Sequence, residues 1–369
     1  MNGRERNASG QRAGLSDPPL AELVERVRAA ARNARPLEIR GGGSKAFYGR
    51  VVRGAPLDVR GLRGIVAYEP SELVITARAG TPLIDIEAAL AAEQQMLGFE
   101  PPHFAPGATV GGAVASGLSG PARPYHGALR DFVLGVELLD GRGELLTFGG
   151  QVMKNVAGFD VSRLIAGSLG TLGVIVQASL RVLPRPQRER TLEWRLSPPV
   201  AQARMLALAR APWPMTALCY DGEILRMRAA GSDEAVTDAV ARLAPDVVAD
   251  ELDYWHALRD LRLPFFAGDE RALWRLSLPP ATPDPPKLGA VLHDWGGAQR
   301  WVRAPADDEI LRAYSVAHGG HATCFSAAGA AIDAPFTPLA PPLCALMQRL
   351  KQALDPQGIF NPGRLYEWL

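Results

Sequence analysis

The stretch PGATVGGAVASGLSGP, residues 106–121, constrains the fold more than any other part of the sequence. Pro106 and Gly107 predict a turn. Thr109 follows, and its hydroxyl is suited to accept a hydrogen bond from an amide of a helix that begins near Val110. The stretch therefore predicts a turn that leads directly into a helix N-terminus.

Gly111 and Gly112 occupy the first turn of this expected helix, where other helices carry side chains. A helix N-terminus bears about half a positive charge, and glycines let a phosphate come close to its amides. We therefore expect an anion site here. The competing interpretation is a glycine-rich loop beneath a close helix crossing, which binds nothing.

A second glycine cluster, GGGSK at residues 41–45, directly follows the predicted strand LEIR at 37–40. Gly41, Gly43 and Ala46 formally fit the dinucleotide motif G-x-G-x-x-A of Rossmann folds. That motif requires a helix to begin within it, whereas the next residues carry glycines and a proline but no helical apolar stripe. A loop of consecutive amides that binds phosphate is therefore favoured over a Rossmann fold.

A third glycine-rich loop carries Gly167, Gly170 and Gly173, between a predicted helix at 161–166 and a predicted strand at 174–183. Three such loops in one half of the chain are more than close packing requires. A large anionic cofactor that lies extended across an α+β unit would require them. The loops together therefore predict a cofactor-binding domain.

The charges nearly cancel, with 40 Lys and Arg against 39 Asp and Glu, and no basic stripe points to nucleic acid. No apolar run approaches the roughly 18 residues of a membrane-spanning helix. Residues 1–15 are charged and lack the apolar core of a signal peptide. We expect a cytoplasmic protein, or one held at the inner membrane through a complex.

The three cysteines, Cys219, Cys324 and Cys344, lie far apart in the sequence. They match neither a disulfide framework nor the four-thiolate set of an iron–sulfur cluster. We expect them to be buried thiols in a reducing compartment.

Local patterns place the other elements. In the first half we expect a helix at 18–33, short strands within 57–80, a helix at 81–95 with Thr81 as cap and Pro82 in its first turn, and a hairpin at 130–150. The second half alternates strand-like and helical runs, which predicts an antiparallel sheet with helices on one side. We expect a disordered tail at 1–14, a cofactor domain at 15–186 and a second domain at 187–369 whose last residues return to the first.

Five motifs together carry a resemblance to a known family. They are GGGSK, PGATVGG, KNVAGFD at 154–160, GSLGTLG at 167–173 and IFNPGRL at 359–365. As a set they resemble the PCMH-type, or vanillyl-alcohol-oxidase, superfamily of FAD-binding domains. Within it, the short chain and the run MKNVAGFDVSRLIAGSLGTLG most resemble the FAD-binding subunits of bacterial glycolate oxidases.

The resemblance implies an α+β fold, with a PCMH-type FAD-binding domain of two α/β subdomains followed by a smaller antiparallel-sheet-plus-helices domain. It implies that the FAD pyrophosphate is held by Arg40, Gly41, Gly42, Gly43, Ser44, Lys45, Pro106, Gly107, Ala108, Thr109, Val110, Gly111, Gly112, Ser116 and Gly117. It places Lys154, Asn155 and Gly158 near the flavin, and Gly173, Val174 and Ile175 near the adenine side.

The chemistry that the resemblance implies is hydride transfer from the α-carbon of glycolate to flavin N5, giving glyoxylate, while a base takes the hydroxyl proton. The sequence does not identify that base. Related dehydrogenases of D-lactate and glycolate have a longer second domain with a histidine cluster. His318 and His321 are the nearest counterpart here, and the alternative is a glycine turn between two ordinary histidines.

Four further residues are candidates near the cofactor. His126 is positioned for a covalent flavin link of the kind some members use, although an ordinary loop histidine is the alternative, and we expect non-covalent FAD. Arg123, Arg130 and Lys154 are cations suited to pair with a carboxylate, or else solvated surface charges.

By resemblance, the partners are a larger homologous FAD-binding subunit and an iron–sulfur subunit of a glycolate oxidase complex. Two alternatives stay open. One is a non-catalytic flavin-binding or electron-relay subunit that supports a homologous catalytic subunit. The other is a free-standing FAD-dependent oxidase.

Overall fold

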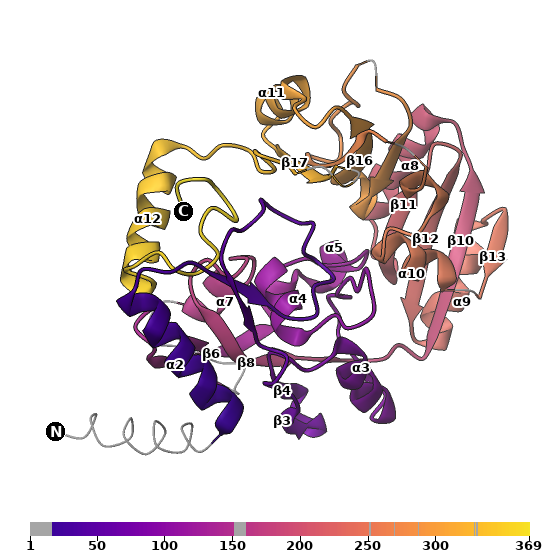
Figure 1. The fold of residues 1–369 in the computed structure, drawn as a ribbon. Coiled ribbons are helices and arrows are strands. Elements are labelled where there is room, and N and C mark those ends of the chain that lie inside the picture. The colour runs from indigo at the N-terminus through magenta and orange to yellow at the C-terminus, as the bar shows by residue number, and fades with distance from the viewer. Residues whose placement is uncertain are drawn as a thin grey trace.

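The computed structural model describes residues 17–150, 160–250, 252–268, 270–286, 288–327, 329 and 331–369. The tail expected at 1–14 lies outside these ranges. Figure 1 shows the N-terminal half as one body and a large sheet of the C-terminal half as a second. The last helix and the C-terminal tail lie back against the first body.

The chain begins with a small α/β unit. Helix α2 (Pro18–Arg32) buries one face, on which Leu20, Leu23, Val24 and Val27 lie as predicted. Strands β1 (Leu37–Arg40) and β2 (Ala55–Asp58) pair in parallel beside it. No helix lies between β1 and β2 in this fully described stretch, which agrees with rejecting a Rossmann fold.

A five-stranded antiparallel sheet forms the centre of the first half, in the order β3-β4-β8-β6-β7. The predicted hairpin is confirmed as β6 (Val133–Leu139) paired with β7 (Leu145–Gly149). The other strands are β3 (Ile65–Glu69), β4 (Val74–Arg78) and β8 (Val174–Arg181), and two short strands, β5 (Gln95–Met96) and β9 (Leu183–Pro184), pair separately. The helices of this half are α3 (Leu83–Ala92), α4 (Val110–Ser116), α5 (Arg123–His126), α6 (Leu129–Phe132) and α7 (Val161–Ile165), with a 3-10 turn η1 (Pro70–Glu72).

The expected cap of α3 is wrong. The N-cap residue is Pro82, and no side chain caps the helix. The Thr81 hydroxyl instead accepts a hydrogen bond from Gly64 N at 2.9 Å and donates one to Gly64 O at 3.1 Å. Thr81 is buried, so its hydroxyl is needed to satisfy the backbone of a neighbouring loop.

The second half is built on an eight-stranded sheet in the order β13-β10-β12-β11-β15-β16-β14-β17, with every pairing antiparallel. Its strands are β10 (Arg188–Arg195), β11 (Met215–Tyr220), β12 (Ile224–Gly231), β13 (Val247–Ala249), β14 (Ala272–Ser277), β15 (Val291–Asp294), β16 (Gln299–Ala304) and β17 (His321–Ser326). Its helices are α8 (Pro198–Ala209), α9 (Asp233–Leu243), α10 (Asp253–Arg259) and α11 (Glu309–Ala317), with 3-10 turns η2 (Pro264–Phe266) and η3 (Trp295–Gly297).

The expectation that helices cover only one side of this sheet is wrong. Leu218 of β11 packs with α8 and α9, whereas its neighbour Cys219 packs with Trp255 of α10. Neighbouring strand residues point to opposite faces, so α10 lies on the other face. Tyr48 and Leu169 of the first half pack on this same face. The sheet therefore buries both faces, because the first half covers one of them.

Helix α12 (Pro341–Leu354) and the tail connect the second half back to the first. The buried Lys351 ammonium donates to Thr171 O at 2.7 Å and to Phe360 O at 2.8 Å, and pairs with Asp355 at 2.8 Å. Phe360 bridges to Leu37 of β1. The C-terminal residues thus complete the first half rather than the second.

Two of the three predictions for cysteines hold. Cys219 and Cys324 are buried free thiols, and burial raises the pKa of each. Cys344 is partly exposed, so its predicted burial is wrong, because it lies on α12, whose outer side faces solvent. Across the described ranges, we find no helix with the length and apolar content that crossing a bilayer requires.

Candidate cofactor site

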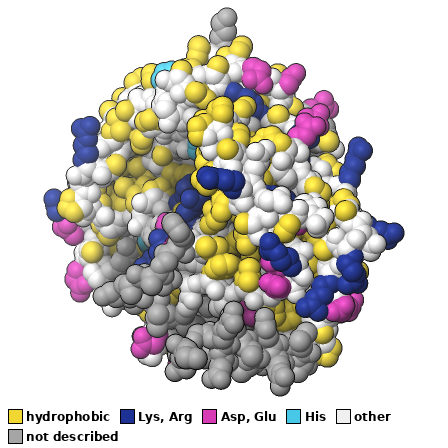
Figure 2. All heavy atoms as spheres, turned by 90° about the vertical axis from the view of Figure 1, so that its left-hand side faces the viewer, with side chains coloured by type: hydrophobic (Ala, Val, Ile, Leu, Met, Phe, Trp, Pro, Cys, Tyr) yellow, Lys and Arg dark blue, Asp and Glu magenta, His cyan; other side chains and the backbone are white. Residues whose placement is uncertain are grey.

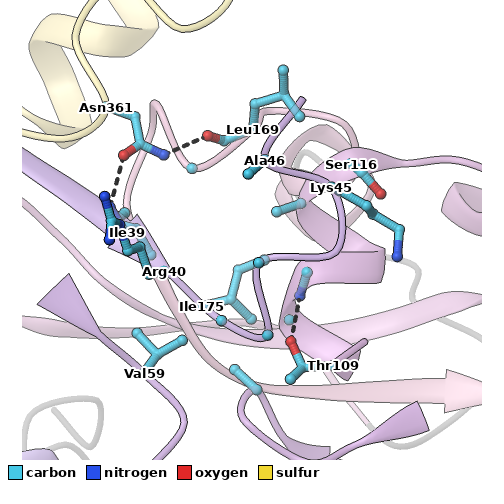
Figure 3. Close-up of a pocket in the computed structure, with 18 of the residues that line it drawn as sticks. Ile39, Arg40, Lys45, Ala46, Val59, Thr109, Ser116, Leu169, Ile175 and Asn361 are labelled. Atoms are coloured by element: carbon cyan, nitrogen blue, oxygen red, sulfur yellow. Dashed lines mark hydrogen bonds between the residues drawn. The ribbon is translucent and has the colours of Figure 1, made fainter. Parts of the chain in front are cut away.

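A cavity of about 380 Å³ lies where the three glycine-rich loops meet. Figure 3 shows its walls, which come from β1 and the first loop, from α4, from the third loop and from the C-terminal tail. The residues that line it are Glu38, Ile39, Arg40, Gly41, Gly42, Gly43, Ser44, Lys45, Ala46, Val52, Val59, Ala79, Thr109, Gly111, Gly112, Ala115, Ser116, Leu169, Gly170, Gly173, Ile175, Asn361 and Arg364.

The first and second loops touch backbone to backbone. A Cβ atom on Gly42 would lie 1.6 Å from Gly107 O, and one on Gly41 would lie 2.7 Å from Thr109 Oγ1. No side chain fits at either distance, so both positions require glycine for close approach. Gly43 has a φ of +73°, which other residues rarely adopt. The loop therefore presents its backbone, and not side chains, to the cavity.

The predicted cap of α4 is confirmed, because Thr109 Oγ1 accepts a hydrogen bond from Gly112 N at 3.2 Å. The amides that were expected to be free for an anion at this helix N-terminus already have partners within the chain. Val110 N donates to Thr81 O at 2.9 Å, and Gly111 N donates to Ala79 O at 2.8 Å.

Gly111 is required for packing. A Cβ atom on it would lie 2.7 Å from the Cβ of Ala79, which directly follows β4. Gly111 therefore has a packing role, although its partner is the segment that follows β4 and not the crossing helix of the competing interpretation. Helix α4 still lines the cavity, through Gly112, Ala115 and Ser116.

The third loop is tied to β1 by a residue of the tail, Asn361. Its Oδ1 accepts from Ile39 N at 2.8 Å, and its Nδ2 donates to Leu169 O at 2.7 Å (Figure 3). Gly170, with a φ of +73°, makes room for it, because a Cβ there would lie 2.7 Å from Asn361 Nδ2. Asn361 therefore sets the spacing between two walls of the cavity.

Arg364 ties the tail to the first loop. Its guanidinium donates to Arg50 O at 2.9 Å and to Ala46 O at 2.8 Å, and it also lines the cavity. Burial lowers the pKa of Arg364, and the carboxylate of Glu38 partly offsets that effect. The guanidinium thus supports the loop and adds positive charge to the cavity wall.

Positive charge predominates along the cavity. Arg40, Lys45 and Arg364 line it, and Glu38 is the carboxylate among its described lining residues. That carboxylate pairs with Arg40 at 2.6 Å. Burial lowers the pKa of Lys45 to about 8, because desolvation disfavours the ammonium. A bound anion would compensate these charges, which fits the pyrophosphate of a dinucleotide.

The structure divides the predicted cofactor residues into three groups. Those that line the cavity are Arg40, Gly41, Gly42, Gly43, Ser44, Lys45, Thr109, Gly111, Gly112, Ser116, Gly173 and Ile175. Those that are described but do not line the cavity are Pro106, Gly107, Ala108, Val110, Gly117 and Val174. Lys154, Asn155 and Gly158 lie outside the described residues.

The histidine and arginine candidates lie elsewhere. His126 Nδ1 lies 3.2 Å from Gly98 O, and His318 stacks on Tyr314 with ring centres 4.1 Å apart. Arg123 lies over the Trp295 ring at 4.5 Å, and Arg130 lines a separate, smaller cavity beside α7. Within the described ranges, no three His, Cys, Asp or Glu side chains group to hold a metal ion.

Comparison with known proteins identifies the family. The chain is 48% identical over 344 residues to the glycolate oxidase subunit GlcE of Escherichia coli K12, across 93% of this chain and 96% of that protein. The chain belongs to the GlcE family of glycolate oxidase subunits. Glycolate oxidase subunit GlcD of Bacillus subtilis 168 is 30% identical over 179 residues, which are 47% of this chain and 38% of GlcD.

The fold of this GlcE-family chain is also that of more distant proteins. A structure of alkyldihydroxyacetonephosphate synthase superposes with a TM-score of 0.65 at 15% identity, over 94% of this chain and 76% of that one. The predicted fold class is confirmed.

Two family models match parts of the chain, and their matches meet at the cavity. Residues 20–149 match the FAD binding domain, and residues 338–365 match the C-terminal domain of FAD linked oxidases. The first segment contributes the first two glycine-rich loops, and the second contributes Asn361 and Arg364. These matches confirm FAD as the cofactor.

Sequence reasoning missed Asn361 and Arg364 as site residues. A signal was present, because both belong to the IFNPGRL motif of the tail. The motif did not indicate which residues of the first half the tail would contact.

Proposed function

We propose that this chain is the FAD-binding subunit of a glycolate, or 2-hydroxy acid, oxidoreductase complex. The observation that carries the proposal is the cavity in which both FAD-family segments meet, in a chain similar over its length to a glycolate oxidase subunit. Its size lies in the usual range for cofactor pockets.

The residues that would hold FAD follow from the cavity walls. The backbone of residues 41–43 and the α4 face at Gly112 and Ser116 leave room for the pyrophosphate, and Lys45 and Arg364 supply the compensating charge. When bound, FAD supplies the acceptor for a hydride from the α-carbon of a hydroxy acid. The chain's own contribution is to bind and orient the cofactor.

We further propose two partner subunits, a larger homologous FAD-binding subunit and an iron–sulfur subunit. Support for the first comes from GlcD of Bacillus subtilis, which aligns with part of this chain. Support for the second is chemical, because three separated cysteines do not supply the four thiolates of a cluster. We place the complex in the cytoplasm or at the inner membrane.

The test uses a complex rebuilt by co-expression with those two partners. The chain alone should show little glycolate-dependent dye reduction, and the complex should show it clearly. Robust turnover by the chain alone would instead support a free-standing oxidase.

A variant tests the remaining alternative, that this subunit binds FAD but does not contribute to catalysis. Gly42→Ala places a Cβ against Gly107 O and should remove FAD from this subunit, while Gly61→Ala, whose Cβ would lie 3.5 Å from the Cβ of Pro19 and outside the cavity, serves as the control. If FAD-free Gly42→Ala complexes keep full activity, the subunit is non-catalytic. Loss of activity in proportion to FAD supports the proposal.

A further inference from the structure

A second cavity, of about 460 Å³, opens beside the cofactor cavity. Leu169 lines both cavities. The other walls of the second one come from β14 and β17 of the large sheet, from α12 and from the tail. Figure 2 views the side of the molecule that carries α12, where hydrophobic side chains gather around a hollow.

An arginine, a histidine and a hydroxyl line one wall. Arg275 of β14 pairs in register with Thr323 of β17, and Ser277 pairs with His321. Residues two apart on a strand share a face, so Arg275, Thr323 and His321 lie on the face that looks toward the first half. All three line the cavity.

Arg275 is held in place without a carboxylate. Its Nη2 donates to the Tyr48 hydroxyl at 3.2 Å, and its guanidinium lies 5.9 Å from the centre of the Tyr48 ring and 5.4 Å from that of Phe325. Among the described residues, no Asp or Glu pairs with it. Its remaining N–H donors are therefore available to a ligand.

The groups that interact with Arg275 include a second arginine and a histidine. Burial lowers the pKa of His321, and Arg275 and Arg123 lower it further. Burial also lowers the pKa of Arg123, with Arg275 and Arg130 adding to the effect and Asp131 opposing it. A bound anion would relieve this repulsion.

Most of the rest of the wall is apolar, and the hydroxyls of Thr337 and Tyr366, which also line it, donate to Ala322 O and Thr337 O. The apolar side chains are Phe336, Leu339, Leu343, Met347 and Leu365. A two-carbon acid would fill only on the order of a quarter of the volume, judged from the space that a water molecule takes. A ligand that used the whole cavity would carry an aliphatic chain against this wall.

We propose that this cavity binds a small monocarboxylate with an aliphatic chain, its carboxylate on the Arg275 guanidinium and its chain along α12. The planar fork of an arginine matches a carboxylate with two parallel hydrogen bonds. The choice of 2-hydroxy acids as ligands rests on the proposed function. The carboxylate and the chain rest on this cavity alone.

The experiment measures binding, not turnover. The full chain, with its FAD content recorded from absorption, is titrated calorimetrically with glycolate and with 2-hydroxyhexanoate. Each buried methylene adds about fourfold in affinity, so 2-hydroxyhexanoate should bind at least about tenfold more tightly than glycolate. Arg275→Met should weaken binding of 2-hydroxyhexanoate by at least about tenfold.

Two variants keep the test independent of folding defects. Leu343 is 44% exposed, so Leu343→Glu should leave folding intact, yet its carboxylate should weaken 2-hydroxyhexanoate binding by at least about fivefold. Arg349→Met removes an exposed arginine of α12 outside the cavity and should change binding by less than about twofold.

The outcomes are separable from those of the proposed function. Binding of 2-hydroxyhexanoate that is unchanged in Arg275→Met and Leu343→Glu would overturn this inference, as would absence of binding to a chain that holds FAD. Equal affinity for both acids would refute the aliphatic preference. A chain that never takes up FAD contradicts the proposed function, while its carboxylate titration still decides this inference.

Discussion

Replacing Asn361 by alanine should loosen the cofactor cavity without touching a cofactor contact of the glycine loops. Asn361 is 6% exposed, and its side chain makes two hydrogen bonds, to Ile39 N at 2.8 Å and to Leu169 O at 2.7 Å. Alanine removes both partners. Each backbone group left unsatisfied when buried costs about 1–3 kcal/mol.

The backbone adds to this cost. Asn361 has a φ of 40°, in the left-handed region that asparagine tolerates better than alanine, so alanine adds roughly 1 kcal/mol of strain. The sum is about 3–7 kcal/mol, a large share of the stability of a typical domain. Asn361→Gly is the matched control, because glycine loses the same two hydrogen bonds but accepts this φ.

Three measurements check the prediction. Denaturant unfolding should show Asn361→Ala as the least stable protein, with the glycine variant about 1 kcal/mol above it. The FAD dissociation constant should rise at least about tenfold in both, because two cavity walls lose their fixed spacing. Hydrogen exchange at the Ile39 amide should accelerate. Unchanged exchange at Ile39 and wild-type FAD affinity in Asn361→Ala would refute the reasoning.

Three further predictions concern single groups. Gly42→Ala should abolish most FAD binding, since its Cβ would lie 1.6 Å from Gly107 O, while Gly61→Ala, outside the cavity, should keep it, as the flavin absorption of the purified variants will show. FAD binding should draw a proton onto Lys45 at pH values between about 8 and its ordinary 10.5, where the free ammonium is partly deprotonated, and calorimetry in two buffers should lose that uptake in Lys45→Met. Burial raises the pKa of Asp294 from 3.8 to about 7, so the folded protein holds a proton that the unfolded chain releases, and stability should fall as pH rises through that window; thermal melts of Asp294→Asn should lack this fall.

Local signals in the sequence predicted most elements of the fold. The apolar spacing of α2 and the turn between β6 and β7 are properties of short segments, and both appear where expected. The contact between the first two glycine loops was also foreseeable, since both loops were expected to serve one ligand. Helix α8 was missed, although prolines at its start mark its N-terminus.

The features that the sequence did not predict depend on contacts between residues far apart in the chain. Gly111 looked like part of an anion site, but Ala79, which lies far from it in the sequence, occupies the space that a side chain would need. Asn361 meets Ile39 across 322 positions of chain. The burial of the second face of the large sheet was likewise not predictable, because the first half of the chain covers it. The sequence pattern of a strand shows that a face is apolar, but not which distant segment packs on it.

The central claim is that the cavity between the three glycine-rich loops holds FAD. The most direct test is to purify the full chain, incubate it with FAD, remove the excess and measure the flavin released into the supernatant by acid precipitation, for the natural chain and for Gly42→Ala. We expect equimolar FAD from the natural chain and little from the variant. A natural chain that remains colourless, or a variant that releases as much FAD as the natural chain, would contradict the account.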